Sequence, residues 1–261
     1  MIVTRFAPSP TGYLHLGHAY AASVAARAGE RFLLRIEDID RGRCRAEFED
    51  AIYEDLAWLG LHWETPVLRQ SERGAAYAEA LAKLDGHGLL YACTCTRKDI
   101  AAAGGAPHGD EGPVYPGTCR ELARPRTGSF ALRLDAAKAA ARVGALSFKD
   151  HDAEIAVDPL LLGDVVLARK EMPAAYHLAV VVDDAHQGVS LVTRGVDLLP
   201  STHVQRLLQA LLNLPVPAYA HHKLILDEEG KKFSKRDAQV TLRGLRARGV
   251  TPLELRRRFE M

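Results

Sequence analysis

The sequence lacks any apolar run of the length that a membrane span requires, about 18 consecutive residues. Its first residues, Met1 to Pro8, also lack the basic stretch followed by an apolar stretch that marks a secretory signal. We therefore expect no membrane partner and a location in the cytoplasm.

An excess of charge of either sign is missing as well. Lys and Arg number 34 against 33 Asp and Glu, a formal net charge of +1. This balance argues against a protein held on nucleic acid by its overall charge. A local basic groove stays possible, because a phosphate backbone responds to the distribution of charge. The arginine-rich tail from Leu242 onward is typical of a solvated helical face.

Cysteines are scarce: the chain has Cys44, Cys93, Cys95 and Cys119. Cys93 and Cys95 are too close along the chain to form an unstrained disulfide, and a reducing compartment favours metal binding. In a strand these two side chains would point to the same face. With Cys119 they provide three soft donors for a tetrahedral zinc ion. Three buried free cysteines are the alternative, and Cys44 matches no pattern.

Strand-like and helix-like stretches alternate from the start of the chain. Residues 2–6 and 31–36 are predicted strands, residues 16–27 are rich in helix formers, and apolar residues recur at helical spacing over 46–59. This order predicts an α/β fold, with a parallel sheet that carries helices on its faces.

The middle of the chain has a different character. Residues 104–113 are rich in glycine and proline, and short strands are predicted at 130–134 and 146–148. We therefore interpret residues 87–170 as a smaller, inserted α+β subdomain. Beyond it the sequence predicts a buried strand over 178–182, a helix over 198–212 and a hairpin turn at 227–230.

Two histidines three residues apart, His15 and His18, stand where a loop leads into a predicted helix. Gly12 and Gly17 allow the backbone to approach a ligand closely. Imidazoles and the amino end of a helix both suit phosphate oxygens. Taken alone, the same residues also fit a loop whose histidines cap or pack.

A second cluster, Lys-Lys-Phe-Ser-Lys-Arg, occupies residues 231–236. A lysine on a mobile loop can neutralise the charge that develops on a leaving pyrophosphate. Taken alone, this cluster fits a charged surface turn equally well.

Together the two clusters resemble the ATP-handling motifs of class I aminoacyl-tRNA synthetases. Residues 15–18, His-Leu-Gly-His, resemble the HIGH element, and residues 232–236 resemble the KMSKS loop. Four further stretches of the chain resemble stretches of the glutamyl and glutaminyl branch, and they occur in the same order. They are residues 34–41, 180–187, 194–199 and 201–205. The resemblance implies a Rossmann-like catalytic domain, residues 1–86 and 171–261, and an enzyme that activates glutamate with ATP for transfer to a tRNA.

The resemblance also implies roles for individual residues. The catalytic residues would be His15, His18 and Lys235. ATP, with magnesium, would be bound by His15, Gly17, His18, Lys232, Ser234 and Lys235. L-Glutamate would be bound by Arg5, Ala7, Ser9, Glu37, Tyr176 and Arg194. Two arginines and one glutamate suit a dicarboxylic amino acid, because guanidinium groups bind carboxylates and an anion binds the ammonium group.

The spacing Cys93-x-Cys95 … Tyr115-x3-Cys119 resembles the zinc site of a shortened branch of these synthetases. The resemblance implies one structural zinc ion, with Tyr115 as the fourth ligand. From chemistry alone, His108 in the glycine-rich loop competes for that position.

The shortened branch glutamylates queuosine, the modified wobble base of tRNA(Asp). The present chain stops about one helix beyond Arg236, so we expect no anticodon-binding domain. The expected substrates and partners are L-glutamate, ATP and the anticodon arm of tRNA(Asp) carrying queuosine, bound by a monomer. Two alternatives stay open: a catalytic fragment of an ordinary glutamyl- or glutaminyl-tRNA synthetase, and a non-catalytic paralogue that binds tRNA.

Overall fold

The computed structural model describes residues 1–261 apart from 103–106, 109–111, 171, 226–240 and 260–261. The chain divides into two compact units. The first comprises residues 1–72, 188–197 and 217–261, and the second comprises residues 73–187 and 198–216.

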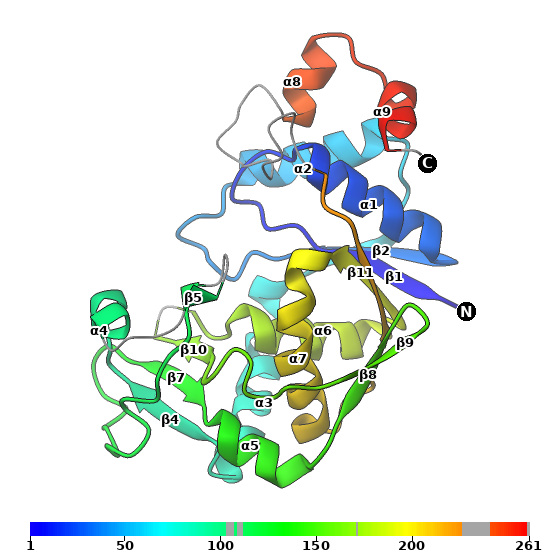
Figure 1. Ribbon diagram of the computed structural model, residues 1–261. Coiled ribbons are helices and arrows are strands. Elements are labelled where there is room, and N and C mark those ends of the chain that lie inside the picture. Colours follow the sequence, from blue (N-terminus) through cyan, green and yellow to red (C-terminus); the bar gives the residue numbers. More distant parts are fainter. Residues whose placement is uncertain (103–106, 109–111, 171, 226–240, 260–261) are drawn as a thin grey trace. The chain divides into compact units, whose positions relative to one another are not determined.

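The first unit is built on parallel strands (Figure 1). They are β1 (Val3–Phe6), β2 (Arg31–Ile36), β3 (Glu64–Arg69), β11 (Leu191–Gly195) and β12 (Ala218–His222). β2 pairs with both β1 and β3, and β11 pairs with β12. β11 also lies beside β1, since Ser190 N donates to Val3 O at 3.0 Å. β2 and β11 thus lie on opposite sides of β1, so the strand order changes direction at β1, which is where open α/β sheets bind ligands.

The helices of the first unit enclose an apolar core. They are α1 (Leu16–Ala28), α2 (Ala46–Trp58), α8 (Leu242–Ala247) and α9 (Pro252–Arg258), with a 3-10 turn at Gln70–Glu72. Ala19, Ala22 and Ala25 are buried, and such small side chains allow α1 to pack closely against β1 and β2. The core also contains Phe6, Leu14, Leu16, Phe32, Leu34, Ile36, Ile52, Leu56, Leu242, Leu245 and Leu255.

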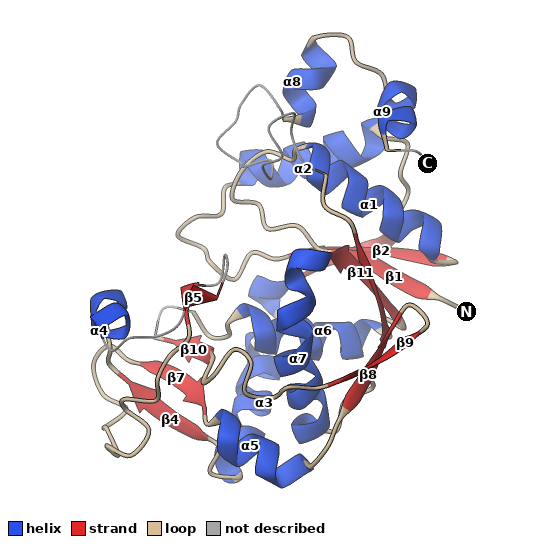
Figure 2. Cartoon of the chain, viewed as in Figure 1, coloured by secondary structure: helices blue, strands red, loops and turns tan. Residues whose placement is uncertain are grey.

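The second unit combines antiparallel strands with packed helices (Figure 2). Its strands are β4 (Leu90–Cys93), β5 (Pro107–His108), β6 (Gly112–Pro113), β7 (Ala131–Leu134), β8 (Ser147–Asp150), β9 (Ala153–Ala156) and β10 (Val166–Arg169). β7 lies between β4 and β10, β8 pairs with β9, and β5 pairs with β6, all of them antiparallel. Its helices are α3 (Gly74–Gly86), α4 (Arg97–Ala102), α5 (Ala136–Val143), α6 (Tyr176–Gln187) and α7 (Leu199–Leu212). A 3-10 turn at Val196–Leu198 precedes α7.

The early alternation of strands and helices, the helix over 198–212 and the strands near 130–134 and 146–148 are confirmed. The strand predicted over 178–182 is wrong, because these residues belong to α6. α6 packs against α3, α7 and β10, so Leu178, Ala179, Val180 and Val181 are all buried. A helix buried on several sides gives a short, continuous apolar run that periodicity cannot distinguish from a buried strand.

Three other expectations have different outcomes. β4 ends at Cys93, so Cys95 lies beyond the strand in which both cysteines were expected. The hairpin turn at 227–230 falls outside the described residues. The division into residues 87–170 and two flanking segments stays a prediction, and by contacts α3 and α6 belong to the second unit.

Over the described part of the chain, no helix has both the length and the apolar character needed to cross a bilayer.

Candidate functional site

His15 and His18 shape the amino end of α1. His15 is the N-cap, and its Nδ1 accepts a hydrogen bond from Gly17 N at 3.1 Å. His18 Nδ1 in turn accepts from His15 N at 3.2 Å, and the two ring centroids lie 3.8 Å apart. Because each Nδ1 accepts, a neutral ring carries its proton on Nε2 and can donate from that atom. Two such donors at a helix amino end suit an anionic ligand.

The chain returns to this point after the lysine cluster. Thr241 forms a backbone bridge with His15, and Leu242 N donates to Leu14 O at 2.8 Å. Lys232, Ser234 and Lys235 lie outside the described residues.

Two buried arginines lie on neighbouring strands of the first unit. Arg5, on β1, is 6% exposed, and its Nη1 donates to Thr193 O at 3.3 Å. Arg194, on β11, is 5% exposed, and its Nε donates to His221 Nε2 at 3.1 Å. The carboxyl end of this part of the sheet therefore carries two cations, which suits a ligand with carboxylates.

Ala7, Ser9 and Glu37 follow the ends of β1 and β2, and all three are partly exposed. Glu37 N donates to Pro8 O at 3.0 Å, which joins the two loops, and Glu37 Oε1 lies 3.6 Å from Arg35 Nη2. The first unit thus brings together five of the six residues assigned to glutamate. The sixth, Tyr176, begins α6 in the second unit and is 36% exposed.

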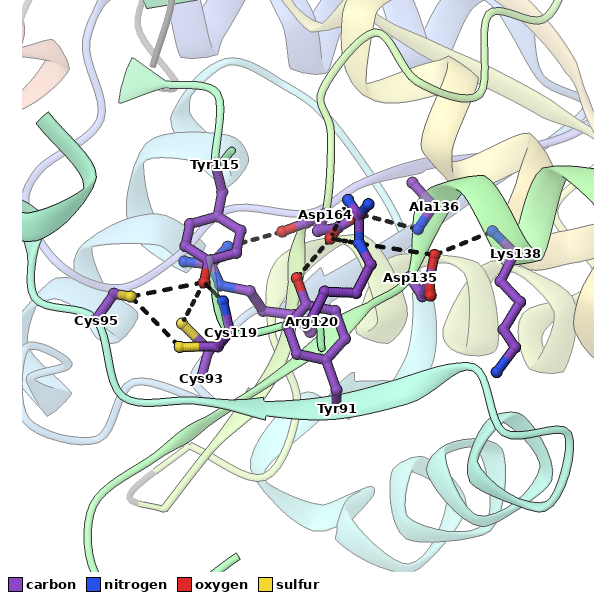
Figure 3. Close-up of polar contacts among 11 residues, drawn as sticks. Tyr91, Cys93, Cys95, Tyr115, Cys119, Arg120, Asp135, Ala136, Lys138 and Asp164 are labelled. Atoms are coloured by element: carbon purple, nitrogen blue, oxygen red, sulfur yellow. Dashed lines mark hydrogen bonds and ion pairs between the residues drawn. The ribbon is translucent and has the colours of Figure 1, made fainter. Parts of the chain in front are cut away.

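The predicted metal ligands gather in the second unit (Figure 3). The Sγ atoms of Cys93, Cys95 and Cys119 all lie within 4.8 Å of one another. The Tyr115 hydroxyl lies 3.4 Å from Cys93 Sγ and 3.5 Å from Cys95 Sγ, and Cys95 Sγ lies 3.5 Å from Cys119 Sγ. Cys93, Tyr115 and Cys119 are buried, and Cys95 is partly exposed.

These separations suit a tetrahedral zinc ion. Bonds of about 2.3 Å to sulfur and about 2.0 Å to oxygen place two sulfurs about 3.8 Å apart and a sulfur about 3.5 Å from an oxygen. The three distances observed come within a few tenths of an ångström of these values. The side chain of His108, the competing fourth ligand, is not among those that the structure describes.

Protonation favours Cys119 as a donor over Tyr115. Burial raises the pKa of Tyr115, and hydrogen bonds with the three cysteines raise it further. Burial also acts to raise the pKa of Cys119, but hydrogen bonds from Tyr115, Thr94 and Cys95 outweigh it and bring that pKa to about 6. A metal that binds Tyr115 must therefore displace a firmly held proton.

Comparisons with known proteins identify the family. Residues 1–260 match the family described as tRNA synthetases class I (E and Q), catalytic domain. A glutamyl-Q tRNA(Asp) synthetase of Rhodobacter capsulatus is 50% identical, over 98% of this chain and 99% of that protein. The chain belongs to the glutamyl-Q tRNA(Asp) synthetase family.

Other members and a solved structure agree with this. The glutamyl-Q tRNA(Asp) synthetase of Symbiobacterium thermophilum is 44% identical, over 97% of this chain and 83% of that protein. The crystal structure of the glutamate-tRNA synthetase of Elizabethkingia anophelis is 28% identical, with a TM-score of 0.71. The match covers 91% of this chain and 53% of that one, so the present chain spans about half of the longer synthetase. The protein is thus an enzyme of the class I synthetase type, with the parallel-sheet catalytic fold of that class.

The sequence alone did not point to the residues that surround the cysteine cluster in this synthetase. Arg133 lies over the Tyr115 ring, and Asp164 binds the side chains of Tyr91 and Arg120. No spacing or motif marks these residues, because each comes from a different segment of the chain.

Proposed function

We propose that the enzyme uses ATP to activate L-glutamate as an adenylate and then transfers the glutamyl group to queuosine in the anticodon arm of tRNA(Asp). The observation that carries this proposal is the 50% identity, over nearly the whole of both chains, with a relative named glutamyl-Q tRNA(Asp) synthetase. Both substrates and the tRNA are found in the cytoplasm, where we expect the enzyme to act as a monomer.

In the first step a glutamate carboxylate oxygen attacks the α-phosphorus of ATP, and pyrophosphate leaves. The glutamate would be held by Arg5, Ala7, Ser9, Glu37, Tyr176 and Arg194. The buried arginines pair with its carboxylates, and Glu37 receives its ammonium group. No protein nucleophile is required, so positioning and charge stabilisation account for the rate.

The phosphates would be bound by His15, Gly17, His18, Lys232, Ser234 and Lys235. The Nε2 donors of the two histidines and the amino end of α1 stabilise charge on the phosphate oxygens. Lys235 neutralises the pyrophosphate as it leaves. Magnesium, when bound with ATP, supplies further positive charge to the phosphates.

In the second step a hydroxyl of queuosine attacks the carbonyl carbon of the adenylate, and AMP leaves. Sequence-specific contacts with RNA are usually made to splayed bases of single-stranded loops, and an anticodon loop presents such a base.

We also propose that Cys93, Cys95, Tyr115 and Cys119 hold one zinc ion. Their separations match a tetrahedral site, and three thiols form a donor set that zinc prefers. Four protein ligands leave no position for a reacting water, so the ion would be structural. It would join β4 to the segment 115–119 within the inserted subdomain, which we place at residues 87–170.

The decisive experiment measures ATP-dependent transfer of labelled glutamate to two RNAs. One is a tRNA(Asp) anticodon stem-loop that carries queuosine, and the other is the same stem-loop with guanosine. The proposal predicts that only the first RNA is labelled. It also predicts that Lys235→Ala lowers the rate of adenylate formation by about 10²–10³-fold. Glutamylation that requires the 3′ end of full-length tRNA would indicate an ordinary synthetase fragment. No pyrophosphate exchange at all would indicate a non-catalytic paralogue.

A further inference from the structure

Arg133, on β7, is a buried cation. It is 8% exposed, its Nη1 donates to the backbone oxygen of Asp164 at 2.7 Å, and its buried Nε has no hydrogen-bond partner. The carboxylate of Asp164 forms its ion pair with Arg120, at 2.7 Å, and among the described residues no carboxylate pairs with Arg133. A buried charge is costly unless an opposite charge compensates it, so a negative group beside Arg133 would stabilise it.

The cysteine cluster can provide that charge. The guanidinium carbon of Arg133 lies 3.8 Å from the centroid of the Tyr115 ring, so the cation faces the ring closely. A zinc ion bound by three thiolates and one phenolate has a net charge of 2 − 4 = −2, given the usual charges of these ligands. An arginine stacked on the phenolate ligand is placed to offset part of this charge.

Asp164 holds this arrangement together (Figure 3). The residue is 1% exposed, and its Oδ2 accepts from Arg120 Nη2 at 2.7 Å and from the Tyr91 hydroxyl at 2.5 Å. Tyr91 lies two residues before Cys93 on β4, and Arg120 directly follows Cys119. One buried carboxylate therefore joins the two segments that carry these cysteines.

Gly163, the residue before Asp164, contacts Tyr115 directly. Gly163 forms a parallel bridge with Tyr115 and has a φ of +60°. A Cβ at this glycine would lie 2.6 Å from Val114 Cγ1, so the close approach depends on glycine. Asp164 and its neighbour thus contact the chain beside three of the four proposed ligands.

We propose that Arg133, held by Asp164, is the positioning residue and counter-cation of the metal site, and that it makes a tyrosine oxygen a usable fourth ligand. This proposal rests on the zinc site of the proposed function. Hydrogen-bonded groups around metal ligands commonly tune affinity by 10–100-fold.

The test compares zinc affinities measured by competition with a chromophoric chelator. We expect Arg133→Gln to weaken zinc binding by about 10–100-fold, and Arg133→Lys, which retains the charge without the planar stack, to recover part of the loss. Co²⁺ in place of zinc should give weaker tetrahedral absorption bands in Arg133→Gln. The matched control is Arg73→Gln. Arg73 holds another buried carboxylate of the same unit, Asp183, at 3.1 Å, and we expect its zinc affinity to stay within about threefold of wild type.

A double-mutant cycle shows whether Arg133 acts through Tyr115. In a Tyr115→Phe background, Arg133→Gln should weaken zinc binding much less than it does in the wild-type background. An equal loss in both backgrounds would overturn the proposal, as would an Arg133→Gln protein that binds zinc as tightly as wild type. If Arg73→Gln weakened zinc binding as much as Arg133→Gln does, the effect of Arg133→Gln would be explained by general destabilisation of the unit. A wild-type protein that binds no zinc would remove the metal site itself, whereas the other outcomes concern Arg133 alone.

Discussion

Arg194 combines burial with a position at the carboxyl end of β11. It is 5% exposed, and its Nε is oriented by His221 Nε2 at 3.1 Å. A guanidinium held in this way is preorganised to bind a carboxylate. At the residue scale, Arg194 is thus a cation that the fold both buries and orients.

We expect Arg194→Ala to raise the KM for glutamate by at least about 10²-fold while the KM for ATP changes little, because a ligand carboxylate loses its partner. ATP–pyrophosphate exchange measures both constants. Arg126→Ala serves as a control, since Arg126 forms an ion pair with Asp85 in the second unit and has no role in the site. Equal losses for the two substrates would point instead to a folding defect.

Asp55 is a buried acid that the proposed reaction does not use. It lies on α2 with 1% exposure, and neither carboxylate oxygen has a hydrogen-bond partner among the described residues. Burial raises its pKa to about 6, although Arg246 and Arg243 act to lower it. Since the folded pKa exceeds the unfolded value of about 3.9, the stability that this group contributes is present below about pH 4 and is lost as the pH rises through 6.

Asp55→Asn removes the buried negative charge and keeps the shape of the side chain. We expect this variant to be more stable than wild type at pH 8, by up to about 3 kcal/mol, and to show no such gain at pH 4. Urea denaturation at the two pH values measures the difference. Asp50→Asn, at an exposed position of the same helix, should change stability little at either pH. A gain that is the same at pH 4 and pH 8 would contradict the titration.

At the scale of elements, the amino end of α1 shows how a helix start positions chemistry. The backbone N–H of Gly17 binds His15, and that of His15 binds His18, so the first turn holds both rings. A Cβ at position 17 would lie 3.1 Å from His15 Cε1 and 3.2 Å from its Nδ1. Glycine at this position thus leaves room for the His15 ring, at a modest cost in helix propensity.

Gly17→Ala should therefore leave the fold intact and displace the His15 ring. We expect adenylate formation to fall by about 10-fold at most, because the ring need move only a few tenths of an ångström, and a misplacement of about 1 Å costs about 100-fold. The matched control is Gly74→Ala at the start of α3, where an added Cβ meets no atom within 4 Å. If Gly17→Ala retained wild-type ATP–pyrophosphate exchange, the position of the His15 ring would have no role in adenylate formation.

At the scale of the whole molecule, the proposed nucleotide and metal sites belong to different compact units. The two histidines lie in the first unit, and the cysteine cluster lies in the second. The first unit contains the sheet of β1, β2 and β3 and the second contains the sheet of β4, β7 and β10, so hydrogen exchange can follow each of these sheets separately.

Removal of zinc should therefore destabilise one unit selectively. We expect chelation to speed amide exchange in β4 and in residues 115–119 and to leave β1 and β2 protected, because only the former carry ligands. Hydrogen exchange with mass spectrometry resolves these segments. Exchange that speeds up equally in β1 and β2 would show that the ion stabilises the whole chain.

The order of the motifs, the βαβ start and the spacing of the cysteines and the tyrosine could all be read from the amino-acid sequence. These features are local: helical and strand periodicity, glycine placement and ligand spacing depend on neighbours along the chain. That is why the strands at 2–6 and 31–36 and the helix that follows His15 agree with the structure.

Which distant residues meet could be learned only from the packed fold. Residues 178–181 form a continuous apolar run because α6 is buried against α3, α7 and β10, and the packing of β7 places Arg133 over Tyr115. Asp164 likewise binds both Tyr91 and Arg120, which are 73 and 44 residues away from it in the sequence. Such contacts depend on how the elements pack together, which local spacing does not encode.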